Sequence, residues 1–255
     1  MEQTYMKEQP ILNLLLKMSL PMVVSMLVNS LYNIVDSFFV AKISENAMTA
    51  LSLVFPVQNL INAVMIGFGI GINAVISFYL GAADQKKADQ AASQGMLLGT
   101  FHGILLMIIC LVVIHPFLSL FTNDAEIVNL GLRYSKIVFL FSVFFAWELV
   151  FEKVFQAVGK MNISMICLMS GCLVNIFLDP VLIFGLGPFP SLGIEGAALA
   201  TGLGQTFSAI LYLIFYMVAP ISVKFRRAYF KPDFALCKKM YSIGIPATVS
   251  YTHLT

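Results

Sequence analysis

The sequence predicts an all-α membrane protein that crosses the bilayer several times, and three observations support this. Hydrophobic residues make up 59% of the 255 residues and charged residues only 11%, against about 25% charged residues in a typical soluble domain. The mean hydropathy is +0.89. Six apolar runs are long enough to cross a bilayer, which takes about 20 residues of helix.

The predicted spans are separated by short polar connections and lie near Met18–Val40, Leu51–Leu80, Gly95–Ile114, Ile137–Val158, Met161–Phe184 and Ala197–Ala219. The second run is longer than a bilayer requires, so we expect it to tilt or to extend past the membrane. The segment before the fourth run, FTNDAEIVNLGLRYSK, is amphipathic and is assigned to a connection. The first run is too long for a signal peptide and lacks a small-residue cleavage pattern, so we expect it to remain as a membrane helix.

Lysine and arginine residues predict the orientation of the chain, because cytoplasmic segments carry an excess of both. With the N-terminus in the cytoplasm, the outer segments hold only Lys42, Arg133 and Lys136. The inner segments then hold the other twelve, which are Lys7, Lys17, Lys86, Lys87, Lys153, Lys160, Lys224, Arg226, Arg227, Lys231, Lys238 and Lys239. We therefore expect a cytoplasmic N-terminus.

A weak internal repeat connects the two ends of the sequence. LLLKMSLPMVVSM near the start is similar to CKKMYSIGIPATVSY near the end, and aligns Ser19–Pro21 with Gly244–Pro246. Each copy is a basic approach to the membrane followed by a proline just inside an apolar run, so the later copy is expected to begin a seventh helix. Because six spans separate the copies, both enter from the same side, as in transporters with parallel repeats.

This repeat predicts the domain organisation. Residues 1–219 are expected to form a six-helix lobe, residues 220–238 a basic cytoplasmic linker, and residues 239–255 the start of a second lobe. The sequence ends nine residues after Pro246, so we expect it to be the first half of a longer protein. The final YTHLT is poor transmembrane sequence, and its origin stays open.

Cysteines, histidines and glycines offer no sign of a metal or nucleotide site. The four cysteines form no CxxC pair and are expected to pack as small apolar residues, and the three histidines have no metal-ligand spacing. The glycines of GFGIGIN lie in a predicted membrane helix and are expected to permit close helix packing rather than to bind phosphate. No cofactor is predicted.

Two polar residues in the fifth span are strong candidates for function. Asn175 and Asp179 are one helical turn apart and therefore lie on one face, and Pro180 removes a backbone donor beside the carboxylate. An ionisable side chain in an apolar helix is costly and usually faces the bundle interior or a water-filled cavity. The alternative is a structural acid whose oxygens are satisfied by a neighbouring hydroxyl or amide.

Three further spans carry polar stripes at helical spacing. Their members are Asn29, Tyr32, Asn33 and Asp36 in the first span, Glu148, Glu152 and Gln156 in the fourth, and Thr201, Gln205 and Ser208 in the sixth. Glu152 and Lys153 lie near the inner end, where snorkelling to the membrane surface explains both. Glu148 lies near the middle and either lines a cavity or pairs helices. Ser208 is expected to join helices.

Depth in the membrane connects these stripes. At about 1.5 Å per residue, Asp36, Asp179 and Thr201 all lie about one helical turn from the outer end of their helices, in one layer. Two carboxylates at one depth in a medium of low dielectric repel one another and are poorly solvated. Such a pair is suited to hold a proton, a sodium ion or an organic cation and to exchange one for another, which is the chemistry of an antiporter.

These strings resemble a known family. LYNIVDSFFVAKI, NIFLDPVLIFGLGPFPSLGIEGAALAT and the proline near the start of the first span are similar to the multidrug and toxic compound extrusion (MATE) family, especially its bacterial DNA-damage-inducible-type branch. The resemblance covers the chain up to about Ser250. It implies two six-helix lobes around a central cavity, a bacterial inner membrane, and export of drug-like organic cations driven by protons or sodium ions. The expected partners are the lipid bilayer and a carboxy-terminal lobe, with no nucleic acid.

The resemblance also implies site residues. By matching motifs, the ion-coupling and substrate-binding residues are Tyr32, Asp36, Asn175, Asp179 and Thr201, with a sodium ion, if one binds, at the two aspartates. The polar stripes themselves, and not the resemblance, add Asn33, Glu148 and Gln205 as secondary candidates for the cavity wall.

Three other functions remain open from the residues alone. A lipid-linked oligosaccharide flippase of the same superfamily would be expected to line its cavity with several arginines or lysines, whereas acids and amides occur here. An intramembrane enzyme would have to use Asp36 and Asp179 as a catalytic pair, without any other protease feature. A channel is disfavoured because the spans carry bulky aromatic residues and no filter-like loop.

Overall fold

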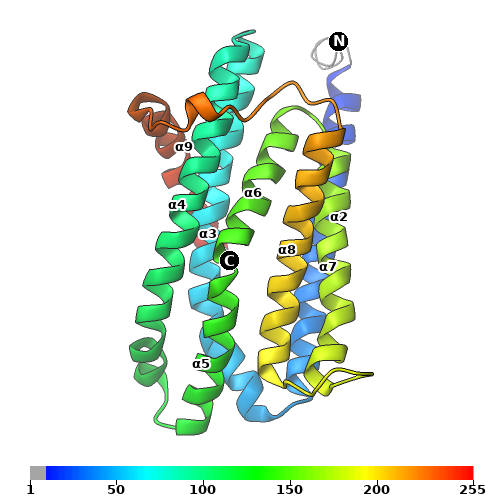
Figure 1. Ribbon diagram of the computed structural model, residues 1–255, viewed down its shortest axis with the longest axis vertical. Helices are drawn as coiled ribbons and strands as arrows, with labels where there is room; N and C mark the ends of the chain where they lie inside the picture. The colour runs from blue at the N-terminus through cyan, green and yellow to red at the C-terminus, as the bar shows by residue number, and fades with distance from the viewer. Residues whose placement is uncertain (1–9, 255) are drawn as a thin grey trace.

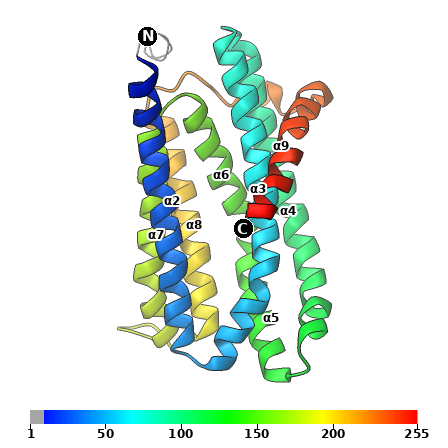
Figure 2. The same ribbon diagram turned by 180° about the vertical axis from the view of Figure 1, so that it is seen from behind.

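The computed structural model describes residues 10–254, which form a bundle of long helices without a β-strand in that range (Figure 1 and Figure 2). The α-helices are α2 (Ile11–Ala41), α3 (Glu45–Gly81), α4 (Gln85–Phe121), α5 (Ala125–Leu140), α6 (Ser142–Ala157), α7 (Met161–Phe184), α8 (Ile194–Val218) and α9 (Phe234–Leu254), with a 3₁₀ helix, η1 (Arg227–Tyr229), before the last. Within residues 10–254, five helices (α2, α3, α4, α7 and α8) are long and apolar enough to cross a membrane. The predicted all-α, polytopic class is therefore confirmed.

The helix that holds the third predicted span extends beyond it at both ends. Gly95–Ile114 lies inside α4, which has 37 residues, as does α3. Such a helix is about 55 Å long, well beyond the roughly 30 Å of the bilayer core. Asp84 begins α4 by accepting a hydrogen bond from the backbone N–H of Lys87 at 3.1 Å. The α3–α4 turn consequently rises past the ends of α6 and α8 (Figure 1).

The fourth predicted span began in the wrong place. The amphipathic segment assigned to a connection is α5, and α5 and α6 lie end to end with only Phe141 between them (Figure 1). The N–H of Phe141 bonds the carbonyl of Val138, three residues back instead of four, at 3.2 Å. Its ring packs on α8 at Gly202, where an added Cβ would lie 2.2 Å from a ring carbon. The span is thus a broken helix.

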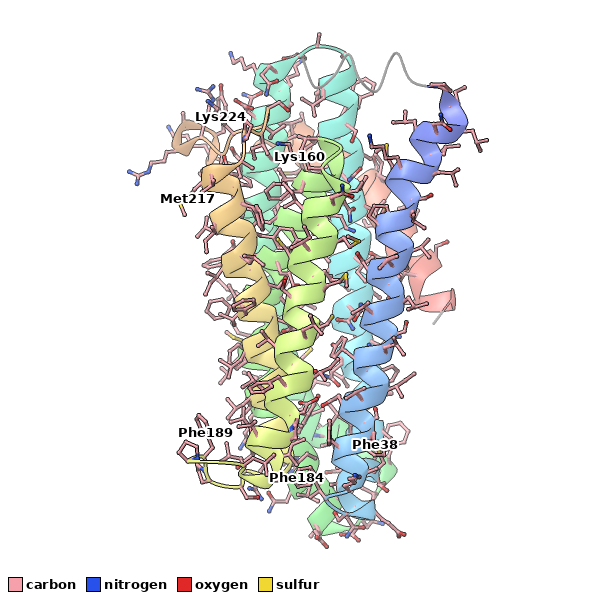
Figure 3. All side chains as sticks on the ribbon, turned by 90° about the vertical axis from the view of Figure 1, so that its right-hand side faces the viewer. Phe38, Lys160, Phe184, Phe189, Met217 and Lys224 are labelled. Carbon is pink, nitrogen blue, oxygen red and sulfur yellow. The ribbon has the colours of Figure 1, made fainter. Side chains whose placement is uncertain are left out.

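Helix α2 lies at the edge of the bundle, mainly against α7 (Figure 3). Its buried residues are only Pro21, Asp36 and Val40, while most of its apolar side chains are exposed. Asp36 is therefore the one charged side chain that α2 buries. The apolar core lies further in, between α3, α4 and α6, and includes Met65, Ile72, Ile76, Val150 and Val154.

The segment after α8 crosses to α4 and leads into α9. This helix starts at the end of the bundle where the chain begins, runs beside α3 and ends near mid-height (Figure 1 and Figure 2). The expected seventh helix is therefore present, and it begins at Phe234, five residues before the predicted second lobe. Thr255 lies outside the described residues, and the division into lobe, linker and second lobe stays a prediction.

Candidate functional site

Helices α7 and α8 hold the hydrogen-bonded part of the site. The Nδ2 of Asn175 lies 3.5 Å from Oδ1 of Asp179 and 3.4 Å from Oγ1 of Thr201, and donates to both. All three side chains are buried, and Asp179 has no exposed surface (0%). The one-turn spacing within α7 and the depth of Thr201 on α8 thus bring an amide, a carboxylate and a hydroxyl together.

Asp36 brings a second carboxylate from α2. Its charge interacts with that of Asp179 and with the Tyr32 hydroxyl. Three oxygens of this cluster, Asp36 Oδ1, Asp179 Oδ2 and Asn175 Oδ1, are buried without a hydrogen-bond partner. Native proteins pair the large majority of buried polar atoms, so these three acceptors are groups that a proton, a cation or a water molecule can satisfy.

The cluster lies near the end of the bundle opposite the N-terminus. Figure 3 shows Phe38 and Phe184 at one end, and Lys160 and Lys224 at the other. Asp36 stands two residues before Phe38, and Asp179 stands five residues before Phe184. The two acids therefore share one layer of the bundle.

A cavity of about 70 Å³ adjoins the cluster between α2, α6, α7 and α8. Its lining residues are Asn29, Tyr32, Phe145, Glu148, Leu168, Gly171, Cys172, Asn175, Thr201, Gly204 and Gln205. Asn175 and Thr201 belong both to the cluster and to the cavity wall, so the cavity lies directly beside the cluster. The wall carries one acid and several amides and hydroxyls, and none of these lining residues is basic.

Two of the three secondary candidates, Glu148 and Gln205, line this cavity. Asn33 does not: it is exposed, and its Nδ2 donates to the backbone carbonyl of Asn29 at 2.9 Å. Asn29 stands on the wall instead. The polar stripe on α2 covers more of the helix surface than the cavity does. Some of its residues therefore face the interior and others face outward.

The sequence did not single out Tyr134 of α5, which also belongs to the site. It is 2% exposed, and its hydroxyl accepts a hydrogen bond from Nε2 of Gln58 at 3.3 Å. Thr201 is close enough to affect it electrostatically. The charges of Asp36 and Asp179 both act on it. Tyr134 was overlooked because its segment was assigned to a connection. The amphipathic pattern of that segment was the available signal.

Snorkelling was the wrong explanation for Glu152 and Lys153. Both are largely buried, and Lys153 Nζ lies 3.0 Å from Glu152 Oε1 and 3.2 Å from Gln156 Oε1. The amide of Gln156 also donates to Glu152, and Asn73 of α3 donates to the Lys153 carbonyl at 3.2 Å. These groups form a second polar cluster on the C-terminal half of α6, where Asn73 of α3 and Ser164 of α7 hydrogen-bond the backbone of the helix and cover it.

Comparison with known proteins agrees with this geometry. A family model described as MatE matches residues 21–181. Multidrug export protein MepA of Staphylococcus haemolyticus (strain JCSC1435) is 31% identical over 244 residues, which cover 95% of this chain and 53% of that protein. MepA of Staphylococcus aureus (strain MRSA252) is 29% identical with the same coverage. This chain spans about half the length of the curated relatives it matches.

Solved structures agree as well. One, described as the outward-facing conformation of a multidrug resistance MATE family transporter of the MOP superfamily, matches with a TM-score of 0.87 at 27% identity, over 94% of this chain and 52% of that one. Another, a MOP superfamily transporter from Pyrococcus furiosus described by the reverse polarity of its binding pocket, matches equally well. Proteins of this kind cross the membrane several times, need no cofactor and are not enzymes. The family match covers more than half of the residues, and the chain therefore belongs to the MATE family, as an amino-terminal part of its fold.

Proposed function

We propose that this chain is the amino-terminal lobe of a secondary active antiporter that exports drug-like, often cationic, compounds in exchange for protons or sodium ions. The observation that carries the proposal is the pair Asp36 and Asp179, buried in one layer, each with an oxygen that has no hydrogen-bond partner. The relatives named multidrug export proteins support the substrate class, and their doubled length supports a second, carboxy-terminal lobe.

The proposed location is the inner membrane of a bacterium, with the N-terminus in the cytoplasm. Twelve of the fifteen basic residues fall on the inner segments under this orientation. Lys160 and Lys224 then lie at the cytoplasmic end of the bundle, and the aspartate pair lies near the outer surface, where an ion can enter from outside (Figure 3).

Ion loading would act through the hydrogen bonds of Asn175. An ionised aspartate only accepts hydrogen bonds, whereas a protonated one also donates. Protonation of Asp179 therefore turns an acceptor of the Asn175 amide into a donor that can satisfy the unpartnered Asn175 Oδ1. The same step removes the negative charge that attracts a cationic drug. A sodium ion would use the same carboxylate, amide and hydroxyl oxygens.

Helix α2 is the element best placed to move with ion binding. It buries few residues, yet it carries Asp36 and Tyr32 to the site. Pro180 beside Asp179, and the asparagines one and two turns before Asp36, supply backbone freedom on both sides of the contact. Solved MATE structures described as being in a bent and in a straight conformation support two states of this fold.

The flippase alternative receives no support from the cavity. A site for pyrophosphate requires basic side chains, and the residues that line the described cavity include none. Glu148 would repel such a ligand. A cationic or neutral substrate fits this wall better.

The test measures drug efflux from proteoliposomes that contain the full-length transporter, under an imposed proton gradient and again under a sodium gradient. Asp36→Asn and Asp179→Asn should each keep the fold and lower gradient-driven efflux by about 100-fold or more, since both remove the ionisable carboxylate. The double variant should be no worse than either single one, as expected for residues that act as a unit.

Glu45→Gln is the matched control, because this acid is exposed in the first turn of α3. It should export at the parental rate. Parental efflux by both aspartate variants under both gradients would mean that the acids are structural and that the proposal is wrong. Efflux that responds to one gradient only identifies the coupling ion.

A further inference from the structure

Glu148 is a third buried acid, and the aspartate pair does not account for it. It is 7% exposed, lies on α6 near the middle of the bundle and lines the cavity opposite Asn175 and Gln205. Lys153 forms an ion pair with Glu152, one turn further along α6, and forms none with Glu148. An intramembrane acid without a cationic partner is costly, and such acids mark ion or proton pathways.

The buried hydroxyl on the neighbouring helix gives Glu148 no positive charge to pair with. Ser208 of α8 is fully buried, and its Oγ donates to the backbone carbonyl of Cys167 at 3.1 Å. Its single hydroxyl proton is therefore already used, and a hydroxyl carries no charge that could balance an ionised Glu148.

Polar groups continue from Glu148 in both directions. Towards the outer end, the cavity reaches Asn175, whose buried Oδ1 has no partner and whose amide contacts Asp179. Its volume of about 70 Å³ has room for water molecules, each of which needs roughly 30 Å³ in the liquid. Towards the inner end, Glu152 is one helical turn away, and the buried Tyr212 of α8 interacts electrostatically with both glutamates.

We infer that Glu148 is a proton-relay residue between the aspartate pair and the cytoplasmic end of the lobe. The inference rests on the proposed antiport and applies to proton coupling. A proton first binds to the carboxylate of Asp36 or Asp179. When it moves on through the cavity, that carboxylate becomes ionised again and Glu148 becomes protonated. It then passes along the Glu152 cluster to water at the inner end, which restores the Glu148 carboxylate. One proton enters and one leaves, and no covalent bond other than O–H changes.

The groups around Glu148 permit this step. The titratable groups within electrostatic range of it are Tyr32 of α2, Cys167 and Cys172 of α7, Tyr212 of α8, and Glu152 of its own helix. None of these is a cation, so nothing holds Glu148 permanently ionised. The Lys153 ammonium neutralises Glu152 instead, and this keeps two adjacent carboxylates from repelling one another at full strength.

The first test is spectroscopic and independent of transport. Infrared difference spectra of the purified protein across a pH step should contain the C=O stretch of a protonated carboxyl that Glu148→Gln removes. Glu148→Asp should keep a shifted band. Glu45→Gln, which changes an exposed acid, should keep the Glu148 band unaltered. An unchanged band in Glu148→Gln would overturn the inference, because Glu148 would then not exchange a proton.

The second test separates the relay from the antiport itself. In proteoliposomes with the full-length transporter, Glu148→Gln should slow efflux driven by a proton gradient by about tenfold or more, while exchange of drug for drug without a gradient continues. Glu148→Asp should recover a large part of the driven rate. Parental driven efflux by Glu148→Gln, or equal loss of driven efflux and exchange in both Glu148 variants, would overturn the relay.

Failure of the proposed function has a different outcome. If Asp36→Asn exports at the parental rate, the antiport site is wrong whatever Glu148→Gln does. If the parent protein responds only to sodium, the antiport stands and the proton relay is overturned.

Discussion

Tyr134 illustrates how a single residue can tie several helices to the site. It lies on α5, and its hydroxyl accepts a hydrogen bond from Nε2 of Gln58 on α3 at 3.3 Å. A buried tyrosine hydroxyl normally finds a partner, and here that partner comes from another helix. Thr201 of α8 is close enough to interact with it electrostatically, so the hydroxyl connects α3 to the helices that hold the site.

Tyr134→Phe is expected to weaken this link without changing the packing of the ring. The Gln58 amide loses its acceptor, and an unpaired buried donor costs about 1–3 kcal/mol. We expect a lower melting temperature of the purified chain and slower efflux under either ion gradient. Tyr229→Phe, in the linker, serves as the control and should leave both unchanged. Parental stability and efflux in Tyr134→Phe would show that the hydroxyl has no role.

Helices α3 and α9 pack closely against each other. A Cβ added to Gly67 would lie 2.1 Å from Thr248 Oγ1, and one added to Gly71 would lie 2.3 Å from the Met240 carbonyl oxygen. Gly244 of α9 faces the Gly67 carbonyl at the same crossing. The glycines of the GFGIGIN string therefore permit close helix packing, as the sequence predicts, and small residues of this kind let helix backbones meet in membranes.

Gly71→Ala should separate the two helices. The new methyl group meets backbone atoms that cannot rotate away, and overpacking of this kind costs about 1–3 kcal/mol. The melting temperature should fall relative to the parent. Gly81→Ala is the matched control on the same helix, because a Cβ there has no neighbour within 4 Å. Equal stability of the two variants would contradict the close crossing.

At the scale of the whole molecule, the segment between α8 and α9 is fixed to α4. Asp89 is 2% exposed and accepts hydrogen bonds from the N–H of Lys224 at 3.0 Å and from Nε of Arg226 at 2.8 Å. Gln94 is 1% exposed, donates to the carbonyls of Tyr229 and Lys231, and accepts from the N–H of Asp233 at 3.1 Å. The basic linker is thus an ordered strap that sets where α9 begins.

Gln94→Ala should release this strap. The variant removes three hydrogen bonds to the linker backbone, so trypsin should cut at the linker lysines and arginines several-fold faster than in the parent. Gln90→Ala, one turn earlier on α4, provides the control. The cleavage should occur in inside-out membrane vesicles and not in right-side-out ones. Cleavage only from outside would reverse the proposed orientation, and equal rates in Gln94→Ala and the parent would contradict the strap.

The order of apolar and polar residues along the chain was enough to predict most of the helices and part of the site. An apolar run long enough to cross a bilayer has to satisfy its backbone groups internally, so it forms a helix whatever surrounds it. The limits of α7, the pairing of Asn175 with Asp179, and the common layer of Asp36 and Thr201 follow from helical spacing and depth alone. Each of these depends on residues within one helix, or on the fixed rise per residue.

Packing between helices determined which of their polar residues lie inside the bundle and which lie at its surface. The break at Phe141 has no proline or glycine of its own and coincides with the contact at Gly202 of α8. Asn33 faces outward although Asn29 lines the cavity, and Lys153 pairs with Glu152 in the interior instead of reaching the surface. These outcomes depend on which neighbouring helix covers a given face, and contacts between residues far apart in the sequence determine that.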